Sequence, residues 1–400
     1  MQVLLVAHNL YVEPTSGAAR SVRTIMEWLH DGGHDCHAVT SGRHDASHAP
    51  DLRAHHDNLG VPTALSFEPG PRPSVRYTLE GVDVLAIETR HTTRESEDDD
   101  GNRQFAEAIA AALGRRPDVV FAYGGHPTVL AALASAHRQG ARTIYTVRAW
   151  GYDHPRFFEN ADRVLTNSSI SVQRHHDRLG LRADWLPSPL TWSEILAPEE
   201  SRGFVTIVNP SPHKGAYLFA RLADMLGATR PDIPILVIQS ERNAADLAAI
   251  PGLDLARHES IMVSPPLARP SDIYALTRIL LVPSLFAEPF GRVAAEAMIN
   301  GIPPLVSTRG ALPETVGPGG IVLPVPDWLL PNTRMLPSEA EVQPWFDAVT
   351  RLWDDPAQYA AASTAARAAA LTLYDEPTLH SRYTAYFEAN GPFPSPLPTK

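Results

Sequence analysis

Residues 283–303 read PSLFAEPFGRVAAEAMINGIP and carry three structural signals in a short space. An apolar run ends at Pro283, which predicts the end of a strand. A loop with Glu288 follows, and a helix is expected to begin near residues 290–291 and to stop at Asn300 and Gly301. A buried strand that leads through a short loop into a helix is the repeating unit of α/β proteins with parallel sheets.

Two carboxylates in this stretch, Glu288 and Glu296, are eight positions apart. In a helix this separation is at most about 12 Å, close to the length of a nucleoside diphosphate sugar from its sugar ring to its ribose. Between them, the backbone N–H groups and the positive dipole end at Phe290, Gly291 and Arg292 suit a pyrophosphate. Taken singly, Glu288 can equally be a first-turn charge favoured by the dipole, and Glu296 a solvated helix residue.

A second stretch, residues 204–215, reads FVTIVNPSPHKG and predicts a strand, a proline-interrupted turn and the start of a helix. The chain contains 34 basic residues, of which only Lys214 and the C-terminal Lys400 are lysines. A single interior lysine in a strand-to-helix loop indicates a need for a compact point charge, and phosphate is its natural target. An exposed lysine without a role is the alternative.

The first strand-to-helix connection, residues 8–20, reads HNLYVEPTSGAAR. Thr15 or Ser16 is expected to cap the helix, and Gly17 lets a ligand approach the backbone closely. The stretch lacks G-x-G-x-x-G, and G-x-x-x-x-G-K-[ST] is also absent from the chain. The chain therefore lacks the usual sequence motifs for binding a dinucleotide or a nucleoside triphosphate.

Composition narrows the classes of protein and of binding partner that remain possible. The 400 residues are 44% hydrophobic and 20% charged, which predicts a folded chain of two or three domains. Cys36 is the only cysteine, so an internal disulfide and a cysteine-built zinc site are excluded and a cytoplasmic setting is expected. The net charge of −11 argues against nucleic acid as a partner, and no apolar run approaches the length of a membrane span. Small molecules are the expected partners.

Short apolar runs alternate with amphipathic stretches in two sets, one in each half of the chain. Strands are expected near residues 3–8, 37–40, 119–123, 143–147, 163–166, 204–208, 235–238, 279–282 and 304–307. Helices are expected near residues 18–30, 103–113, 128–138, 216–226, 273–278, 291–300, 341–353 and 359–373. Between the two sets, a proline-rich stretch without sustained periodicity is predicted to be a linker.

Two further clusters resemble metal sites only superficially. Residues 92–102 include three consecutive aspartates, for which a metal site is the alternative, but a solvated loop is favoured because adjacent carboxylates repel each other and no other ligand cluster is evident. The histidine pairs 55–56 and 175–176 match no metal-ligand spacing and are predicted to lie on the surface. The sequence therefore predicts no metal site.

These stretches together resemble the retaining GT-B glycosyltransferases of glycosyltransferase family 4. The stretch EPFGRVAAEAM, residues 288–298, resembles that family's E-x₇-E element, and residues 208–215 resemble its strand leading to Lys-Gly. Residues 15–20 are similar to its N-terminal glycine loop and residues 118–127 to the stretch with its active-site histidine. The resemblance extends from residue 1 to about residue 325 and is strongest between 283 and 317.

The resemblance implies a GT-B fold: two Rossmann-like α/β domains, each with a doubly wound parallel sheet, facing each other across a cleft. On this basis residues 1–187 form an N-terminal acceptor domain, 188–202 the linker and 203–375 a C-terminal nucleotide-sugar domain. Residues 376–390 form a C-terminal helix that can return to the N-terminal domain, and the proline-rich residues 391–400 form a flexible tail.

The resemblance also implies roles for single residues. Glu288 corresponds to the glutamate that contacts the hydroxyls of the transferred sugar, and Glu296 to the one that accepts both ribose hydroxyls. Lys214 resembles the lysine on the donor phosphates, assisted by the backbone at residues 290–292. Gly17 is similar to the glycine that meets the donor, and His126 is the nearest match to the histidine beside the transferred sugar.

Two departures leave alternatives open. The family has an arginine five or six residues before the lysine, where this chain has Val208 and Asn209. The residues that could replace this arginine are Arg20, Arg148, Asn209 and Ser211. The histidine motif is also altered to FAYGGH, residues 121–126, in which Tyr123 competes with His126 for the position beside the sugar.

The function implied is transfer of a sugar from a UDP- or GDP-linked donor to a hydroxyl of a small molecule or saccharide. The resemblance implies retention of the anomeric configuration and no metal or other cofactor. Two alternatives remain: a GT-B enzyme with another nucleotide-sugar or sugar-phosphate reaction, and a non-catalytic protein that only binds nucleotide. Residues 51–77 are interrupted by prolines and not strongly basic, so a membrane-surface acceptor and stable membrane insertion are not expected.

Overall fold

The computed structural model describes residues 1–13, 16–43, 52–58, 66–68, 70–89, 99–239, 247, 250–267 and 269–390. The chain divides into two compact units. Unit 1 comprises Met1–Pro189 and Pro377–Lys400, and unit 2 comprises Leu190–Glu376. The predicted flexible tail, residues 391–400, lies outside the described residues.

The described part of unit 1 contains a nine-stranded sheet in the order β3-β4-β5-β2-β1-β6-β7-β8-β9. The strands are β1 (Gln2–Ala7), β2 (Asp35–Ser41), β3 (Ser66–Glu68), β4 (Ser74–Leu79), β5 (Val82–Ile87), β6 (Val119–Tyr123), β7 (Arg142–Thr146), β8 (Arg163–Thr166) and β9 (Asp184–Trp185). The pairs β3/β4 and β4/β5 are antiparallel, and the other neighbouring pairs are parallel.

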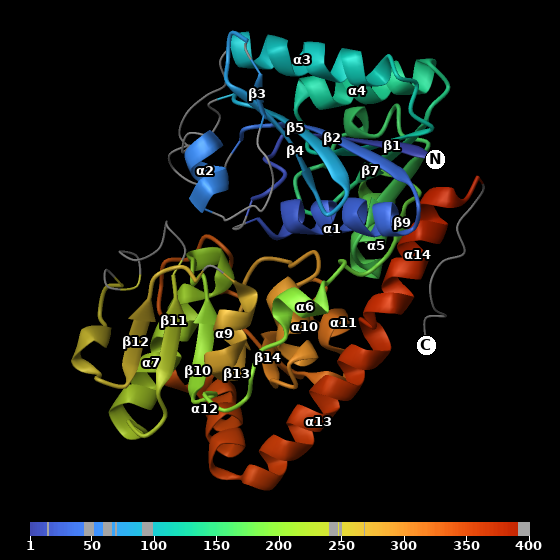
Figure 1. Cartoon of the computed structure of the whole chain (residues 1–400). Helices are drawn as coiled ribbons and strands as arrows, with labels where there is room; N and C mark the ends of the chain where they lie inside the picture. Colours follow the sequence, from blue (N-terminus) through green and yellow to red (C-terminus); the bar gives the residue numbers. More distant parts are fainter. Residues whose placement is uncertain are drawn as a thin grey trace. The chain divides into compact units, whose positions relative to one another are not determined.

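Helices cover both faces of this sheet. They are α1 (Gly17–Asp31), α2 (Leu52–Asn58), α3 (Asp99–Leu113), α4 (Pro127–Arg138), α5 (Ser169–Leu179), the 3₁₀ turn η1 (Pro155–Phe157) and α14 (Glu376–Glu388). Helices α3 and α4 lie side by side on one face and α1 lies against the other (Figure 1). Phe105 of α3 and Val129 of α4 pack on Leu4 and Val6 of β1, because alternate side chains of a strand point to the same face.

The described part of unit 2 contains six parallel strands in the order β12-β11-β10-β13-β14-β15. The strands are β10 (Phe204–Val208), β11 (Ile235–Ile238), β12 (Ile261–Ser264), β13 (Thr277–Val282), β14 (Pro304–Ser307) and β15 (Ile321–Leu323). Central strand β10 pairs with β11 on one side and β13 on the other. The chain therefore winds outward in both directions from β10.

The helical segments of unit 2 are α6 (Trp192–Ile195), η2 (Pro212–Lys214), α7 (Ala216–Thr229), η3 (Leu255–Arg257), α9 (Pro270–Leu276), α10 (Arg292–Ile299), α11 (Leu312–Val316), η4 (Gly317–Gly319), α12 (Glu339–Asp354) and α13 (Pro356–Leu373). Helices α7 and α12 share one core with strands β10, β11 and β13. Trp345 of α12 is fully buried there, and its indole N–H donates to the Pro324 carbonyl at 2.9 Å.

The C-terminal helix α14 packs on unit 1 although the preceding α13 belongs to unit 2. The Tyr383 hydroxyl donates to the Pro187 carbonyl at 2.7 Å, and Arg163 donates to the Tyr386 carbonyl at the same distance. A ring nitrogen of His380 lies 2.6 Å from the Trp28 carbonyl oxygen. These contacts attach the last described helix to both α1 and the sheet of unit 1.

Residues 190–202, within the predicted linker, belong to unit 2. They include α6 and hydrogen-bond to the end of α10, where the Ala197 N–H donates to Asn300 Oδ1 at 2.9 Å. Arg202 donates to the Asn300 carbonyl at 2.8 Å.

The predicted fold class, two α/β units with doubly wound and mainly parallel sheets, is confirmed. The prediction for the histidine pairs is wrong for three of the four residues: only His176 is exposed. His55, His56 and His175 are buried, and one ring nitrogen of each lies within 2.8 Å of a backbone carbonyl oxygen, which helps to offset the cost of burying the ring. Among the described residues, no helix combines the length and apolar character that crossing a membrane requires.

Candidate active site

Each sheet has a switch point, a pair of neighbouring strands whose following connections run in opposite directions along the sheet. In unit 2 it lies between β10 and β13, and in unit 1 between β1 and β6. In open α/β sheets, ligands bind beyond the carboxyl ends of the strands at such points. The loops after β10 and β13 carry Lys214 and Glu288, and the loops after β1 and β6 lead to Gly17 and His126.

Lys214 reaches the end of β13 because of the backbone at Gly215. Gly215 has φ of 87°, and a Cβ atom there would overlap the carbonyl oxygen of Pro283. Only glycine fits both the left-handed conformation and this close approach. The loop after β10 is therefore drawn against the loop after β13, and Lys214 immediately precedes the point of contact.

Lys214 and Glu288 form the ion pair at the centre of unit 2's switch point. Lys214 Nζ lies 2.5 Å from Glu288 Oε1, and the Ser284 hydroxyl donates to the same oxygen at 2.7 Å. The Lys214 side chain is 30% exposed, whereas that of Glu288 is 7% exposed. The ammonium also lies 4.9 Å from the centre of the Phe286 ring. The structure thus brings the two predicted site residues into direct contact, with the cation on the more accessible side.

The backbone of Glu288 is fixed by a second close approach. Gly310 pairs with Glu288 in an isolated β-bridge, and the Ala311 N–H donates to the Glu288 carbonyl at 2.8 Å. Gly310 has φ of 63°, and a Cβ atom there would overlap the backbone N and O of Glu288. This contact positions the glutamate.

Helix α10 begins directly after these residues. Gly291 is its N-cap residue, with φ of 94°, and the Thr315 hydroxyl donates to the carbonyl of Phe290. The first turn of a helix has no intrahelical acceptors for its N–H groups, so it offers donors and a positive dipole end to an anion. The structure places Phe290, Gly291 and Arg292 at this helix start, and their contact with a phosphate stays a prediction.

Glu296 lies one turn into α10 and is buried, with 3% of the residue exposed. Arg292 Nε donates to its Oε1 at 2.6 Å, and the Tyr274 hydroxyl donates to its Oε2 at 2.7 Å. The alternative of a solvated helix residue is therefore wrong. The carboxylate is a buried, hydrogen-bonded group held by two other side chains.

His126 lies at the carboxyl edge of unit 1's sheet, directly after the loop that follows Tyr123. It is the N-cap of α4, and its Nδ1 accepts from the Thr128 N–H at 3.2 Å. Its ring stacks on His8, with centroids 3.7 Å apart and an interplanar angle of 7°. Because Ala7 and Tyr123 are paired in register, the residues that follow them meet at the switch point.

Gly17 is the first residue of α1 and is exposed, and Arg20 lies one turn further on. Ser16 is the N-cap, and its hydroxyl accepts from the Ala19 N–H at 3.4 Å. Thr15, the alternative cap, lies outside the described residues. The predicted helix start is thus assigned to Ser16.

Candidates for the missing phosphate-binding arginine differ in their surroundings. Arg148 is 5% exposed, and its two terminal nitrogens lie 3.5 and 3.4 Å from the Tyr383 hydroxyl of α14. Asn209, with φ of 53°, and Ser211 lie in the same loop as Lys214, and Ser211 Oγ is 3.1 Å from His213 Nδ1. Arg148 therefore holds α14 within unit 1, whereas Asn209 and Ser211 remain beside the lysine.

Four residues at this site were not predicted: Ser284, Tyr274, Gly310 and His213. Burial lowers the pKa of His213, with a further contribution from the Lys214 charge, so its ring is neutral near pH 7. The carbonyl of His213 accepts from the Leu285 N–H at 2.9 Å and ties the two loops together. Among the described residues, no group of three or more His, Cys, Asp and Glu side chains is arranged to hold a metal ion.

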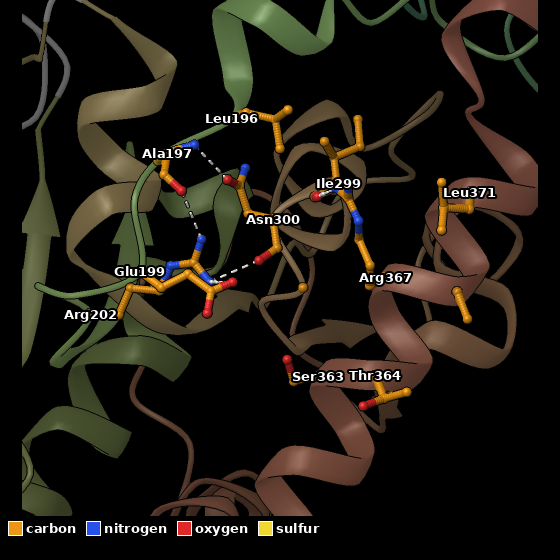
Figure 2. A pocket seen from close by; sticks show the side chains of 12 residues that line it. Leu196, Ala197, Glu199, Arg202, Ile299, Asn300, Ser363, Thr364, Arg367 and Leu371 are labelled. Atoms are coloured by element: carbon orange, nitrogen blue, oxygen red, sulfur yellow. Dashed lines mark hydrogen bonds and ion pairs between the residues drawn. The ribbon is translucent and has the colours of Figure 1, made fainter.

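A separate cavity of about 530 Å³ opens at the opposite end of α10 (Figure 2). It lies between the segment around Ala197, the C-terminal end of α10 at Asn300 and helix α13. Arg202 and Arg367 enter from two sides and donate to the carbonyls of Asn300 and Ile299. Its lining includes neither Lys214 nor Glu288, so it is distinct from the switch-point site.

Two family models match consecutive parts of the chain. A glycosyl transferase 4-like domain matches residues 16–186, and a domain of the glycosyl transferases group 1 matches residues 193–368. Their boundary falls close to the division between the two units. Comparison with curated protein sequences gives no match.

Solved structures with the same fold include three that are 12–16% identical to this chain. Sucrose-phosphate synthase from Thermosynechococcus elongatus has a TM-score of 0.67 at 16% identity, over 97% of this chain and 98% of that one. HepE from Anabaena in complex with UDP and glucose has a TM-score of 0.63 at 15% identity, over 96% and 99%. An α,α-trehalose-phosphate synthase from Burkholderia xenovorans in complex with glucose-6-phosphate has a TM-score of 0.64 at 12% identity, over 97% and 100%.

At these identities the structural likeness establishes the fold, and the two family models establish the class of enzyme. The chain is a GT-B glycosyltransferase, with an N-terminal domain of the glycosyl transferase 4-like type and a C-terminal domain of the glycosyl transferases group 1.

Proposed function

We propose that this glycosyltransferase moves a sugar from a UDP- or GDP-linked donor to a hydroxyl of a small molecule or saccharide. In the proposal the transfer retains the anomeric configuration and needs no metal ion. The observation that carries it is the Lys214–Glu288 pair, 2.5 Å apart, at the switch point where α10 begins. The complexes of the Anabaena protein with UDP and glucose, and of the Burkholderia enzyme with glucose-6-phosphate, support a nucleotide-sugar donor and a sugar acceptor.

The leaving diphosphate accumulates negative charge as its bond to the sugar breaks. Lys214 is 30% exposed and carries three N–H donors, so its ammonium can bind a phosphate oxygen while it remains near Glu288. The backbone N–H groups at the start of α10 add fixed dipoles around the same position. One preorganised donor of this kind is typically worth about 3–4 kcal/mol of barrier lowering.

Glu288 orients the sugar and is not the nucleophile in this proposal. The bond between the anomeric carbon and the diphosphate oxygen breaks, and the acceptor oxygen forms a bond on the same face. The departing phosphate oxygen takes the proton of the acceptor hydroxyl, so charge and atoms balance without another base. Glu296 binds the ribose, and in unit 1 Gly17 contacts the donor and His126 lies beside the transferred sugar.

The first experiment measures binding and transfer with the purified chain. UDP and GDP are screened by thermal shift, because a ligand at 100 times its Kd stabilises by about 2.7 kcal/mol. The corresponding nucleotide sugars are then assayed with a panel of hydroxyl acceptors, with and without EDTA, and the product's anomeric configuration is read by NMR. Activity that is lost with EDTA, or a product of inverted configuration, would contradict the corresponding part of the proposal.

Variants test the residue assignments. We expect Lys214→Ala and Glu288→Ala each to lower transfer by at least about 100-fold, because each removes a group beside the reacting bond. Glu339→Ala is the matched control, since Glu339 is an exposed first-turn glutamate of α12. Unchanged turnover in either site variant that folds normally would refute the assignment of that residue.

A further inference from the structure

The Tyr274–Glu296 contact joins two residues that are 22 positions apart in the sequence and belong to different helices. Tyr274, in α9, is fully buried, and its hydroxyl donates to Glu296 Oε2 at 2.7 Å. A buried phenol must bond its hydroxyl, and a neutral acceptor, the Val293 carbonyl, lies 3.4 Å away, yet the shorter bond is made to the carboxylate. The Tyr274 hydroxyl therefore bonds a carboxylate that is itself nearly inaccessible, which indicates that the orientation of this carboxylate matters.

Arg292 and Tyr274, which both hydrogen-bond Glu296, differ in how easily they can move. Arg292 is a long side chain in the first turn of α10, 11% exposed, and its Nε bonds Oε1 at 2.6 Å. Tyr274 has only two side-chain torsions and no exposed surface. A ribose that approaches the carboxylate can therefore displace Arg292, whereas Tyr274 stays.

The backbone at Tyr274 is held by a hydrogen bond from a further side chain, that of Arg202. Arg202 Nε donates to the Tyr274 carbonyl at 3.3 Å, and another nitrogen of the same guanidinium donates to the Asn300 carbonyl at 2.8 Å. Figure 2 shows this guanidinium beside Ala197 and Asn300, the residue that caps the C-terminal end of α10. Arg202 thus links the element that carries Tyr274 to the helix that carries Glu296.

We propose that Tyr274 is a positioning residue for nucleotide recognition: its hydroxyl holds the Glu296 carboxylate in the orientation that accepts the ribose hydroxyls of the donor. An ionised carboxylate offers about four acceptor positions, so it can keep the tyrosine bond while it accepts hydroxyl donors. The inference rests on the proposed function, because it assumes a nucleoside diphosphate at this site. It adds a residue outside the E-x₇-E stretch to the recognition of the sugar ring of the nucleoside.

The test compares ribose with 2′-deoxyribose. Dissociation constants of UDP, 2′-deoxy-UDP, GDP and 2′-deoxy-GDP are measured by calorimetry for the wild type and for Tyr274→Phe. We expect the wild type to bind the ribose form of its nucleotide about tenfold more tightly than the deoxy form, the value of one hydrogen bond to a charged group. In Tyr274→Phe this ratio should fall to about threefold or less, mainly through weaker binding of the ribose form.

Tyr359→Phe is the matched control, because it removes a hydroxyl that donates to the Arg278 carbonyl at 3.3 Å elsewhere in unit 2. It should leave the ribose-to-deoxyribose ratio unchanged. A general loss of stability would weaken both nucleotide forms alike and leave the ratio intact, so a ratio in Tyr274→Phe equal to the wild type's would overturn the inference alone. A wild type that binds no nucleoside diphosphate would instead refute the proposed function, and the inference with it.

Discussion

The ion pair between Lys214 and Glu288 can be tested by removing each charge separately and then together. Lys214→Met keeps the aliphatic stem and removes the ammonium, and Glu288→Gln keeps the shape of the side chain and removes its charge. In the structure Glu288 Oε1 accepts from both Lys214 and Ser284. The single lysine variant therefore leaves a buried carboxylate with one neutral donor, whereas the double variant leaves only a neutral amide.

The burial of the two side chains sets the expected magnitude. Removing one partner of a fully buried pair costs about 3–5 kcal/mol, because the other charge remains in the interior. Here Glu288 is 7% exposed but Lys214 is 30% exposed, so water screens part of the interaction. We expect Lys214→Met to lower the free energy of unfolding by about 1–3 kcal/mol. Adding Glu288→Gln should restore about 1–2 kcal/mol as the coupling energy of the pair.

Calorimetric unfolding is the appropriate assay, because a chain of two units need not unfold in one step. For a domain of 150–250 residues, each kcal/mol shifts Tm by about 2–4 °C, so both effects are measurable in the transition of unit 2. Distant, independent substitutions add within about 0.5 kcal/mol. If the changes in unfolding free energy caused by Lys214→Met and Glu288→Gln add within that margin in the double variant, the ion pair contributes nothing to stability and the reasoning from its geometry is wrong.

Three further outcomes follow from single contacts. Gly310→Ala should lower both Tm and transfer activity, because a side chain at φ of 63° is strained and its Cβ atom would push the Glu288 backbone out of place. A normal kcat in this variant would argue against the role of Glu288. The pKa of His213 is lowered in the folded chain by burial and by the neighbouring lysine, so the unfolded chain takes up the proton first as pH falls. Its contribution to stability is full above its ordinary pKa of about 6.5 and is lost as pH falls through the lowered value, so His213→Asn should show a smaller drop in Tm between pH 7 and pH 5 than the wild type. Tyr383→Phe removes the hydroxyl that donates to the Pro187 carbonyl and contacts Arg148. It should destabilise unit 1 by about 1–3 kcal/mol and leave the melting of unit 2 unchanged. Equal shifts of the two melting transitions would contradict this prediction.

Strands with continuous apolar runs could be predicted closely from the sequence. The expected ranges 119–123, 163–166, 204–208, 235–238 and 304–307 coincide with β6, β8, β10, β11 and β14. Central parallel strands are buried on both faces, so their apolar character is strong and their ends are marked by turn residues. The same signal located the loops that carry Lys214 and Glu288.

Elements with weaker apolar character were missed. The hairpin of β4 and β5 alternates buried and exposed residues around Glu80 and Gly81, both with positive φ, and this alternation with a glycine turn was an available signal. Helix α5 buries only Ser171 and His175, so it shows no apolar stripe. Its omission explains why His175 was wrongly predicted to lie on the surface.

Contacts between distant segments could not be predicted from spacing within one motif. Nothing in residues 283–303 indicates that Tyr274 bonds Glu296, since the partner lies in another helix. Gly310 is also outside that stretch, and its need for positive φ becomes visible only when the Glu288 backbone lies against it. The sequence thus predicts which groups carry charge at the site, whereas the tertiary fold determines which groups hold them.

The scarcity of lysine has a practical consequence for chemistry in solution. Besides the terminal amine, an acylating reagent finds only Lys214 and Lys400 along the whole chain. Modification at the partly exposed Lys214 can therefore be followed as a single added mass on one peptide, with Lys400 as an internal reference. A bound diphosphate would shield that amine, so the yield of the adduct reports occupancy of the phosphate position beside Lys214 without any knowledge of the sugar or the acceptor.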